Sequence, residues 1–198
     1  MKRPIVIEFS GLPNSGKTTL LGNIKEMCLI NSVKATIIQE PAELLPKSIP
    51  KGITEQNLWI TLETIQKSLE LKYYSDIDYI LLDRGFYNQL FWSTMYEEKD
   101  GEYSKYVMNL MEGFDGRYNV KPDYLYIIDV DVDVEESMRR RAASGEPVTF
   151  SKKDFLIKYQ EKFSKFSENI ANKIYLDTTG MTPKEVADDV YKKIVALQ

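Results

Sequence analysis

The sequence predicts an α/β fold in which a mostly parallel sheet of about five strands lies between two layers of helices. Short, β-branched apolar runs recur along the chain, and amphipathic helical segments separate them. The runs are nearly continuous in apolar character, which is typical of strands covered by helices on both faces. Alternation of strand and helix then favours a parallel, three-layer arrangement. The predicted strands are Ile5–Ser10, Ala35–Gln39, Tyr79–Asp83, Tyr124–Val130 and Ile174–Asp177.

Predicted helices fill the intervals between these strands. The first follows Lys17, a long one covers about 54–74, and two more cover 85–96 and 103–111. Asp133 offers the start of a short helix through a capping box. Apolar residues three and four positions apart predict the next helix, and they are Phe155, Tyr159, Phe163, Phe166 and Ile170. A capping threonine, a proline and a capping glutamate then predict a last helix, and they are Thr182, Pro183 and Glu185.

Composition narrows the class of protein further. A chain of 198 residues fits one domain, 1–198, with room for a small lid. The net charge of −4 gives no reason to expect nucleic-acid binding. Cys28 is the single cysteine, which excludes an internal disulfide and suits a reducing compartment. We expect a cytoplasmic protein without a membrane span, and the lack of histidine excludes a histidine base or metal ligand.

The most informative motif is Gly11–Thr18, which directly follows the first predicted strand and directly precedes a helix. It reads Gly, four residues, then Gly-Lys-Thr, the spacing of a phosphate-binding P-loop. Glycines let the backbone turn and present N–H groups to a phosphate, and the helix start adds a positive dipole end. Lys17 would reach the β- and γ-phosphates, and Thr18 would ligate Mg²⁺. The residues expected to contact a nucleoside triphosphate are Gly11, Asn14, Ser15, Gly16, Lys17, Thr18 and Thr19.

Charged residues also stand where other predicted strands end. Glu40 follows the second strand, and Asp83 and Arg84 lie at the end of the third. Asp177 and Thr178 lie at the end of the fifth. Ligands of an open parallel sheet bind at the carboxyl ends of its strands, so we expect these residues to meet at one rim.

Each of these residues has a functional and a plainer interpretation. Asp83 occupies the place where P-loop proteins keep the acid that holds Mg²⁺ or its water, and it could equally cap a helix. Arg84 could clamp a phosphate with its planar fork, or form a surface ion pair. Glu40 is placed to act as a general base, or is an ordinary acid at a strand end.

An arginine run, Arg139-Arg140-Arg141, opens a polar stretch, 139–151, that contains Gly145 and Pro147. Arginines on a closing flap stabilise the charge of a transferring phosphoryl group and exclude water. We therefore expect a lid here, with Arg139 and Arg141 as candidate catalytic residues. The alternative is a solvated charged face.

Aromatic residues and one helix supply weaker candidates. The group Phe86, Tyr87, Phe91, Trp92 and Tyr96 could stack on a base, although such spacing is more often core or a dimer face. Trp59 and Glu63, one turn apart on the long second helix, are candidates for contacting a phosphoryl acceptor.

Taken in order, these motifs resemble the thymidylate kinase and deoxynucleoside kinase superfamily. The segments that carry the resemblance are Gly11–Thr18, Glu40-Pro41, Asp83-Arg84, 121–130, 139–146 and 176–179. It implies a P-loop kinase fold of five parallel strands, with ATP as donor, Mg²⁺ as cofactor, and a homodimer. Glu40, Asp83 and Arg84 would face the acceptor, the lid arginines would cover the phosphates, and Asp177 and Thr178 would lie on the adenine side.

The chain departs from the thymidylate kinase pattern on the acceptor side. Pro13 replaces a carboxylate of the P-loop, Gly85 replaces an aromatic residue, and the helix around Trp59 lacks the arginine that holds the acceptor's phosphate. The acceptor therefore remains open between a nucleoside, a nucleoside monophosphate and another small hydroxyl-bearing molecule. A GTPase-type switch and a nucleotide-binding regulator without catalysis are the alternatives, although 119–123 lacks the contiguous guanine-reading motif.

Overall fold

The computed structural model describes residues 3–97, 100–129, 134–143, 145, 150–178 and 180–197. Five strands form one sheet in the order β2-β3-β1-β4-β5, and every neighbouring pair is parallel. The strands are β1 Ile5–Ser10, β2 Ala35–Ile38, β3 Tyr79–Asp83, β4 Tyr124–Asp129 and β5 Lys173–Asp177. The parallel α/β prediction is confirmed, and β2 ends and β5 begins one residue earlier than predicted. Val130, the predicted end of the fourth strand, lies outside the described residues.

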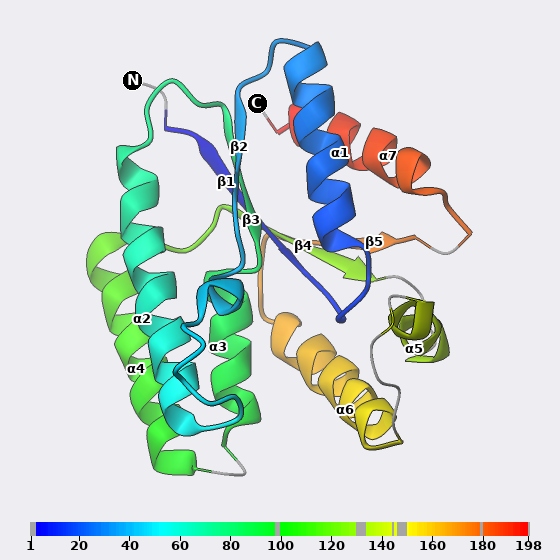
Figure 1. The fold of residues 1–198 in the computed structure, drawn as a ribbon. Helices are drawn as coiled ribbons and strands as arrows, with labels where there is room; N and C mark the ends of the chain where they lie inside the picture. The colour runs from blue at the N-terminus through cyan, green and yellow to red at the C-terminus, as the bar shows by residue number, and fades with distance from the viewer. Residues whose placement is uncertain are drawn as a thin grey trace.

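Helices cover both faces of this sheet (Figure 1). The α-helices are α1 Lys17–Ile30, α2 Thr54–Glu70, α3 Phe86–Met95, α4 Gly101–Tyr118, α5 Val134–Ala143, α6 Phe150–Ser167 and α7 Pro183–Val195. Two short 3₁₀ helices are η1 Pro41–Leu44 and η2 Leu71–Tyr73. Helices α1 and α7 lie together on one face, and α2, α3, α4 and α6 lie on the other.

Several helices differ from their predicted bounds, and α3 is one residue shorter at each end than predicted. The long second helix ends at Glu70, and the residues that continue its pattern form η2. Helix α4 is longer than predicted because Gly113 and Gly116 are exposed, where glycine costs only ~1 kcal/mol each. Helix α6 already begins at Phe150, so the expected lid, 139–151, shares its ends with α5 and α6. Asp133, Ser144 and 146–149 lie outside the described residues.

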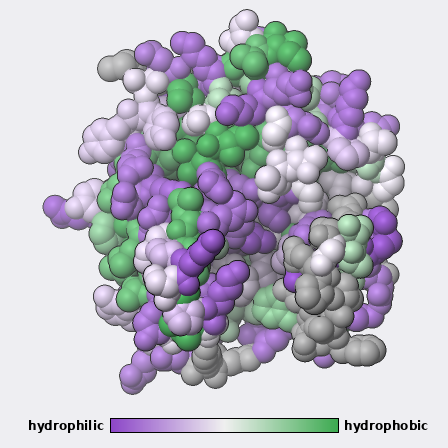
Figure 2. All heavy atoms as spheres, viewed as in Figure 1, coloured by the Kyte–Doolittle hydropathy of each residue, from purple (hydrophilic) through white to green (hydrophobic). Residues whose placement is uncertain are grey.

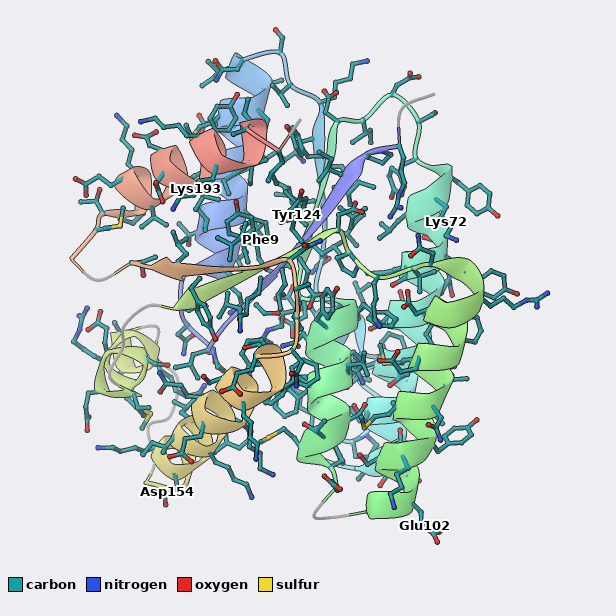
Figure 3. All side chains as sticks on the ribbon, turned by 180° about the vertical axis from the view of Figure 1, so that it is seen from behind. Phe9, Lys72, Glu102, Tyr124, Asp154 and Lys193 are labelled. Atoms are coloured by element: carbon teal, nitrogen blue, oxygen red, sulfur yellow. The ribbon has the colours of Figure 1, made fainter. Side chains whose placement is uncertain are left out.

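The central strand β1 separates two hydrophobic cores. Ile7 and Phe9 are fully buried against α1 and α7, and Figure 3 shows Phe9 between the sheet and α1. Glu8 lies between them in sequence, so its side chain points to the opposite face, toward α3. The aromatic residues of α6 form the core on that face together with Phe91 of α3. The prediction that these aromatic residues share one helix face is confirmed, whereas Ile170, predicted with them, lies beyond the end of α6 at Ser167 and still packs against the same cluster.

The capping box at the start of α7 is present as predicted. Thr182 accepts a hydrogen bond from the backbone N–H of Glu185, and the Glu185 carboxylate accepts one from the N–H of Thr182. Cys28 is buried in α1. On the face that Figure 2 shows, hydrophilic residues predominate and hydrophobic areas are small. Within the described part of the chain, no helix combines the length and apolar character needed to cross a bilayer.

Candidate active site

The loop between β1 and α1 has the backbone conformation that its glycines allow. Gly11 has φ of 146° and Gly16, the residue before α1, has φ of 88°. Both values lie in regions that side-chain-bearing residues rarely adopt. The chain therefore leaves β1, turns tightly and starts α1 at Lys17, which places the positive end of the helix dipole at the loop.

Lys17 is enclosed by this loop. Its side chain is buried, and Nζ donates to the carbonyl oxygens of Gly11 (3.3 Å) and Leu12 (2.8 Å) and to Oγ of Ser15 (3.1 Å). Burial, followed by the nearby Arg84, lowers the pKa of Lys17 to about 7. An anion beside Nζ stabilises the charged amine, so phosphate binding would raise this pKa again.

Thr18 and Asp83 connect the loop to the end of β3. Oγ1 of Thr18 donates to Oδ2 of Asp83 at 2.7 Å. The other carboxylate oxygen, Oδ1, is buried and has no hydrogen-bond partner among the described residues. A buried carboxylate oxygen left unpaired beside a hydroxyl suits Mg²⁺, which takes one or two protein oxygens and completes its shell with water and phosphate. Among the described residues, no cluster of three or more acidic or cysteine side chains offers an all-protein metal site.

Glu40 and Arg84 form the second charged pair of the rim. Nη1 of Arg84 donates to Oε1 of Glu40 at 2.6 Å, and both side chains are mostly buried. Burial alone would lower the pKa of Arg84, but the Glu40 carboxylate outweighs it and raises the pKa, so the guanidinium stays charged. The backbone of Arg84 has φ of 56°, while its N–H still donates to the carbonyl of Phe9 in β1. This turn directs the arginine across the sheet edge toward the end of β2.

Several cavities adjoin these residues, and two of them are lined by the P-loop and by the Glu40–Arg84 pair. The first, of about 480 Å³, is lined by 14–20 of the P-loop and α1 and by Thr178, Met181, Pro183 and Val186. The second, of about 230 Å³, lies between the end of β2, α2 and α3, and Glu40 and Arg84 line it. Lys17 and Thr18 line the first cavity, and Thr18 bonds Asp83, the neighbour of Arg84. The cluster therefore stands between the two cavities.

The structure brings together most of the residues predicted at the strand ends. Lys17, Thr18, Glu40, Asp83 and Arg84 form one cluster, in which hydrogen bonds join Thr18 to Asp83 and Arg84 to Glu40. Lys17 belongs to it because Arg84, Asp83 and Glu40 lie near enough for their charges to shift its pKa. The first cavity is lined by Asn14, Ser15, Gly16, Thr19 and Thr178, while Gly11 contributes the carbonyl that Lys17 binds.

The other candidates lie elsewhere or are less fully described. Asp177 pairs with Asp129 at the end of β5, and its side chain is outside the described part of the structure. Arg139 is exposed and pairs with Glu136 on its own helix. Neither it nor Arg141 lines the two cavities. Trp59 and Glu63 also do not line either of these cavities. Glu63 pairs with Lys67.

One contact that the sequence did not indicate holds α5 over the P-loop. Oγ of Ser137 donates to the carbonyl oxygen of Pro13 at 2.8 Å. Val134 and Met138 of α5 pack in the same hydrophobic cluster as Leu12. The helix that carries the arginine run is thus fixed to the phosphate-binding loop at its first turns. No local pattern signals this contact, because the two segments are more than a hundred residues apart.

Glu8 is the second feature that sequence reasoning missed. It is fully buried, and its carboxylate accepts hydrogen bonds from the backbone N–H groups of Tyr87 (3.0 Å) and Asn88 (2.8 Å) and from Oγ of Ser10 (3.3 Å). Burial outweighs these hydrogen bonds and raises the pKa of Glu8 to about 7. A Cβ on Gly85 would lie 3.1 Å from Oε2 of Glu8. The signal was available, since Glu8 is the one acid inside the apolar run of β1.

The strand order and the P-loop motif between β1 and α1 give the chain a P-loop kinase fold of the thymidylate kinase type. Among solved structures, thymidylate kinase from Candida albicans is similar with a TM-score of 0.67, covering 98% of this chain and 92% of that chain. The two sequences are 18% identical, so the likeness establishes the fold. The sequence matches no protein-family model and none of the curated proteins with which it was compared. The fold expected from the ordered motifs is confirmed.

Proposed function

We propose that this protein transfers the γ-phosphoryl group of ATP, with Mg²⁺, to a nucleoside or a nucleoside monophosphate. The observation that carries the proposal is the pair of cavities on either side of the charged cluster. A phosphotransferase has to hold two substrates next to each other, whereas a nucleotide-dependent switch needs one binding site. The thymidylate kinase-like fold supports the same conclusion.

The first cavity would hold the donor. Backbone N–H groups of 14–19 and the start of α1 would bind the phosphates, and Thr178 and Met181 would lie toward the base. Lys17 would exchange its carbonyl partners for phosphate oxygens. Thr18 and Asp83 would hold Mg²⁺, which when bound neutralises charge on the phosphates.

The second cavity would hold the acceptor. Glu40 lines this cavity and belongs to the charged cluster between the two cavities. It would therefore take the proton of an attacking hydroxyl. Arg84 would fix Glu40 through their ion pair and stabilise charge on the transferring group. We further propose that Arg139 and Arg141 act from a lid, 139–151, because Ser137 ties their helix to the P-loop.

A direct assay tests this function. Purified protein is incubated with Mg²⁺, ATP and a panel of nucleosides and nucleoside monophosphates, and products are identified by mass spectrometry. We expect a new phosphorylated product that depends on Mg²⁺ and disappears in Lys17→Ala. Absence of product from every acceptor would contradict the proposal. ATP binding without transfer would then favour a regulator, and preferential GTP binding would favour a switch.

A further inference from the structure

The second cavity contains little positive charge for a site next to phosphates. Among the described residues that line it, Arg84 is the single cation, and Glu40 already binds it at 2.6 Å. We infer that the phosphoryl acceptor is an uncharged molecule of nucleoside size, and that nucleoside monophosphates are discriminated against. This inference rests on the proposed function and specifies its acceptor.

The α2 wall of the cavity supports this choice. The residues of α2 that line it are Gln56, Asn57, Ile60 and Thr64, none of which carries a charge. On the facing helix α3, the lining residues Asn88, Gln89 and Trp92 are also uncharged. The charged residues beside these positions on α2 are Glu55, Glu63 and Lys67, and none of them lines the cavity. Glu63 pairs with Lys67.

A hydrogen-bond network fixes what Gln89 can offer to a ligand. Its Nε2 donates to Oδ1 of Asn57 (2.7 Å) and to Oγ1 of Thr61 (2.8 Å), while the Thr61 hydroxyl itself donates to the Asn57 carbonyl (2.7 Å). Because both of these oxygens act as acceptors, the Gln89 atom that faces them has to be the donor Nε2, which determines the orientation of the Gln89 amide. Its Oε1 is then a hydrogen-bond acceptor on a residue that lines the cavity. An acceptor oxygen binds N–H or O–H groups and repels a phosphate oxygen.

The balance of energies follows from these groups. A phosphate dianion in this cavity would lose water and meet the Glu40 carboxylate and the Gln89 carbonyl oxygen, while the charge of the one lining cation is already paired with Glu40. Two buried donors of the lining, Nε of Arg84 and Nδ2 of Asn57, have no partner among the described residues and can bind the hydroxyl or carbonyl oxygens of an uncharged molecule. An uncharged molecule avoids this cost, can donate to Gln89, and can place a ring against Ile60, Trp92 and Tyr96. The volume of about 230 Å³ is below the usual ~300–1,000 Å³ of ligand pockets, which favours a compact acceptor.

A binding experiment separates this inference from the proposed function. With Mg²⁺ and a non-hydrolysable ATP analogue present, isothermal titration compares nucleosides with their own 5′-monophosphates. We expect a Kd at least ~10-fold lower for a nucleoside than for its monophosphate, since one such factor corresponds to ~1.4 kcal/mol. Tighter binding of the monophosphate, or binding of neither, would overturn the inference. Failure of the ATP analogue itself to bind would contradict the proposed function instead.

Introducing charge into the cavity provides a matched test. Ile60→Arg places a cation on the lining face of α2, and Leu62→Arg places one on the same helix at a position that is 53% exposed and outside the cavity. We expect Ile60→Arg to lower the Kd for a monophosphate at least ~10-fold and Leu62→Arg to leave it unchanged. If Ile60→Arg unfolds the protein, Gln56→Lys, at a half-buried lining position, replaces it. The role of charge would be refuted if the cavity variant and Leu62→Arg changed the Kd for a monophosphate equally, or if the cavity variant left it unchanged.

Discussion

The two cavities of the site are built from the chain in contrasting ways. The first cavity, which we propose for the donor and call the donor cavity, is lined mainly by one continuous segment, 14–20, with the start of α7 as its other wall. The second cavity, which we propose for the acceptor and call the acceptor cavity, gathers side chains from the end of β2, η1, α2 and α3, which span 40–96. A short segment can fix phosphate binding by backbone geometry alone, whereas acceptor choice depends on how several helices pack. Under the proposed function, this difference assigns phosphate binding to the loop and the choice of acceptor to the helices.

The largest effect is expected on the donor side. Lys17→Ala should lower phosphoryl transfer at least ~10³-fold, because it removes the buried cation that we propose contacts the phosphates. Lys25→Ala, an exposed lysine of the same helix, is the control and should keep full activity. Initial rates and melting temperatures of the three proteins check this. A Lys17→Ala variant with unchanged turnover would remove the P-loop from the mechanism.

On the acceptor side, we expect Glu40→Gln to lower kcat ~10²-fold while the Kd for ATP changes less than ~2-fold, because a base acts in the transfer step alone. Glu43→Gln, three residues further along η1 and exposed, should have wild-type kinetics. Steady-state kinetics and ATP titrations distinguish the two variants. A loss of ATP affinity in Glu40→Gln would place this residue on the donor side and erase the contrast between the cavities.

Glu8 binds the backbone of Asn88, a residue that lines the acceptor cavity, and the titration of Glu8 should change the free energy of unfolding. Its pKa in the folded protein is about 7, above the ordinary value of 4.5, so the folded state keeps the proton up to a higher pH than the unfolded state does. The free energy of unfolding should therefore fall as pH rises from about 4.5 to 7, by at most ~3 kcal/mol, and level off above.

Urea denaturation at several pH values between 5 and 7 measures this slope. Glu8→Gln should flatten it, whereas Glu26→Gln, at an exposed position of α1, should keep it. No histidine titrates in this range. The shifted pKa of Lys17 acts above pH 7 and in the opposite direction, since that folded pKa lies below its ordinary value. A slope that survives in Glu8→Gln would show that other groups cause it.

The smallest effect is expected at the boundary of the two cavities. Asp83→Asn keeps an oxygen near Thr18 but removes the negative charge, so the Mg²⁺ concentration for half-maximal activity should rise ~10-fold. Asp78→Asn, just before the other end of β3, should leave the metal titration unchanged. Identical Mg²⁺ curves for wild type and Asp83→Asn would exclude a metal role for this carboxylate.

The parts of the site that the sequence predicts are those that depend on local geometry. The P-loop is contiguous, and Asp83, Arg84 and Glu40 follow strands whose carboxyl ends meet in any parallel sheet. Their mutual contacts, including the Glu40–Arg84 pair, needed only the strand order to be β2-β3-β1.

The remainder depends on packing between distant segments, which periodicity does not encode. The bond from Ser137 to Pro13 and the Gln89–Asn57 network join residues through helix positions that sequence alone leaves free. Glu8 was detectable as an acid in an apolar strand, but its partners at the start of α3 were not. The aromatic residues of α3 divide similarly, because Phe86 and Phe91 are core while Trp92 and Tyr96 line a cavity.

The capping box of α7 has a practical consequence for redesigning donor preference. Pro183 and Val186 stand in the first turn of α7 and form part of the donor cavity, and that turn is held by Thr182 and Glu185. Mutations there would loosen a helix end that packs on α1 as well as reshape the wall. Met181 precedes the cap and is 36% exposed, so a library intended to exchange one purine triphosphate for another should begin with it.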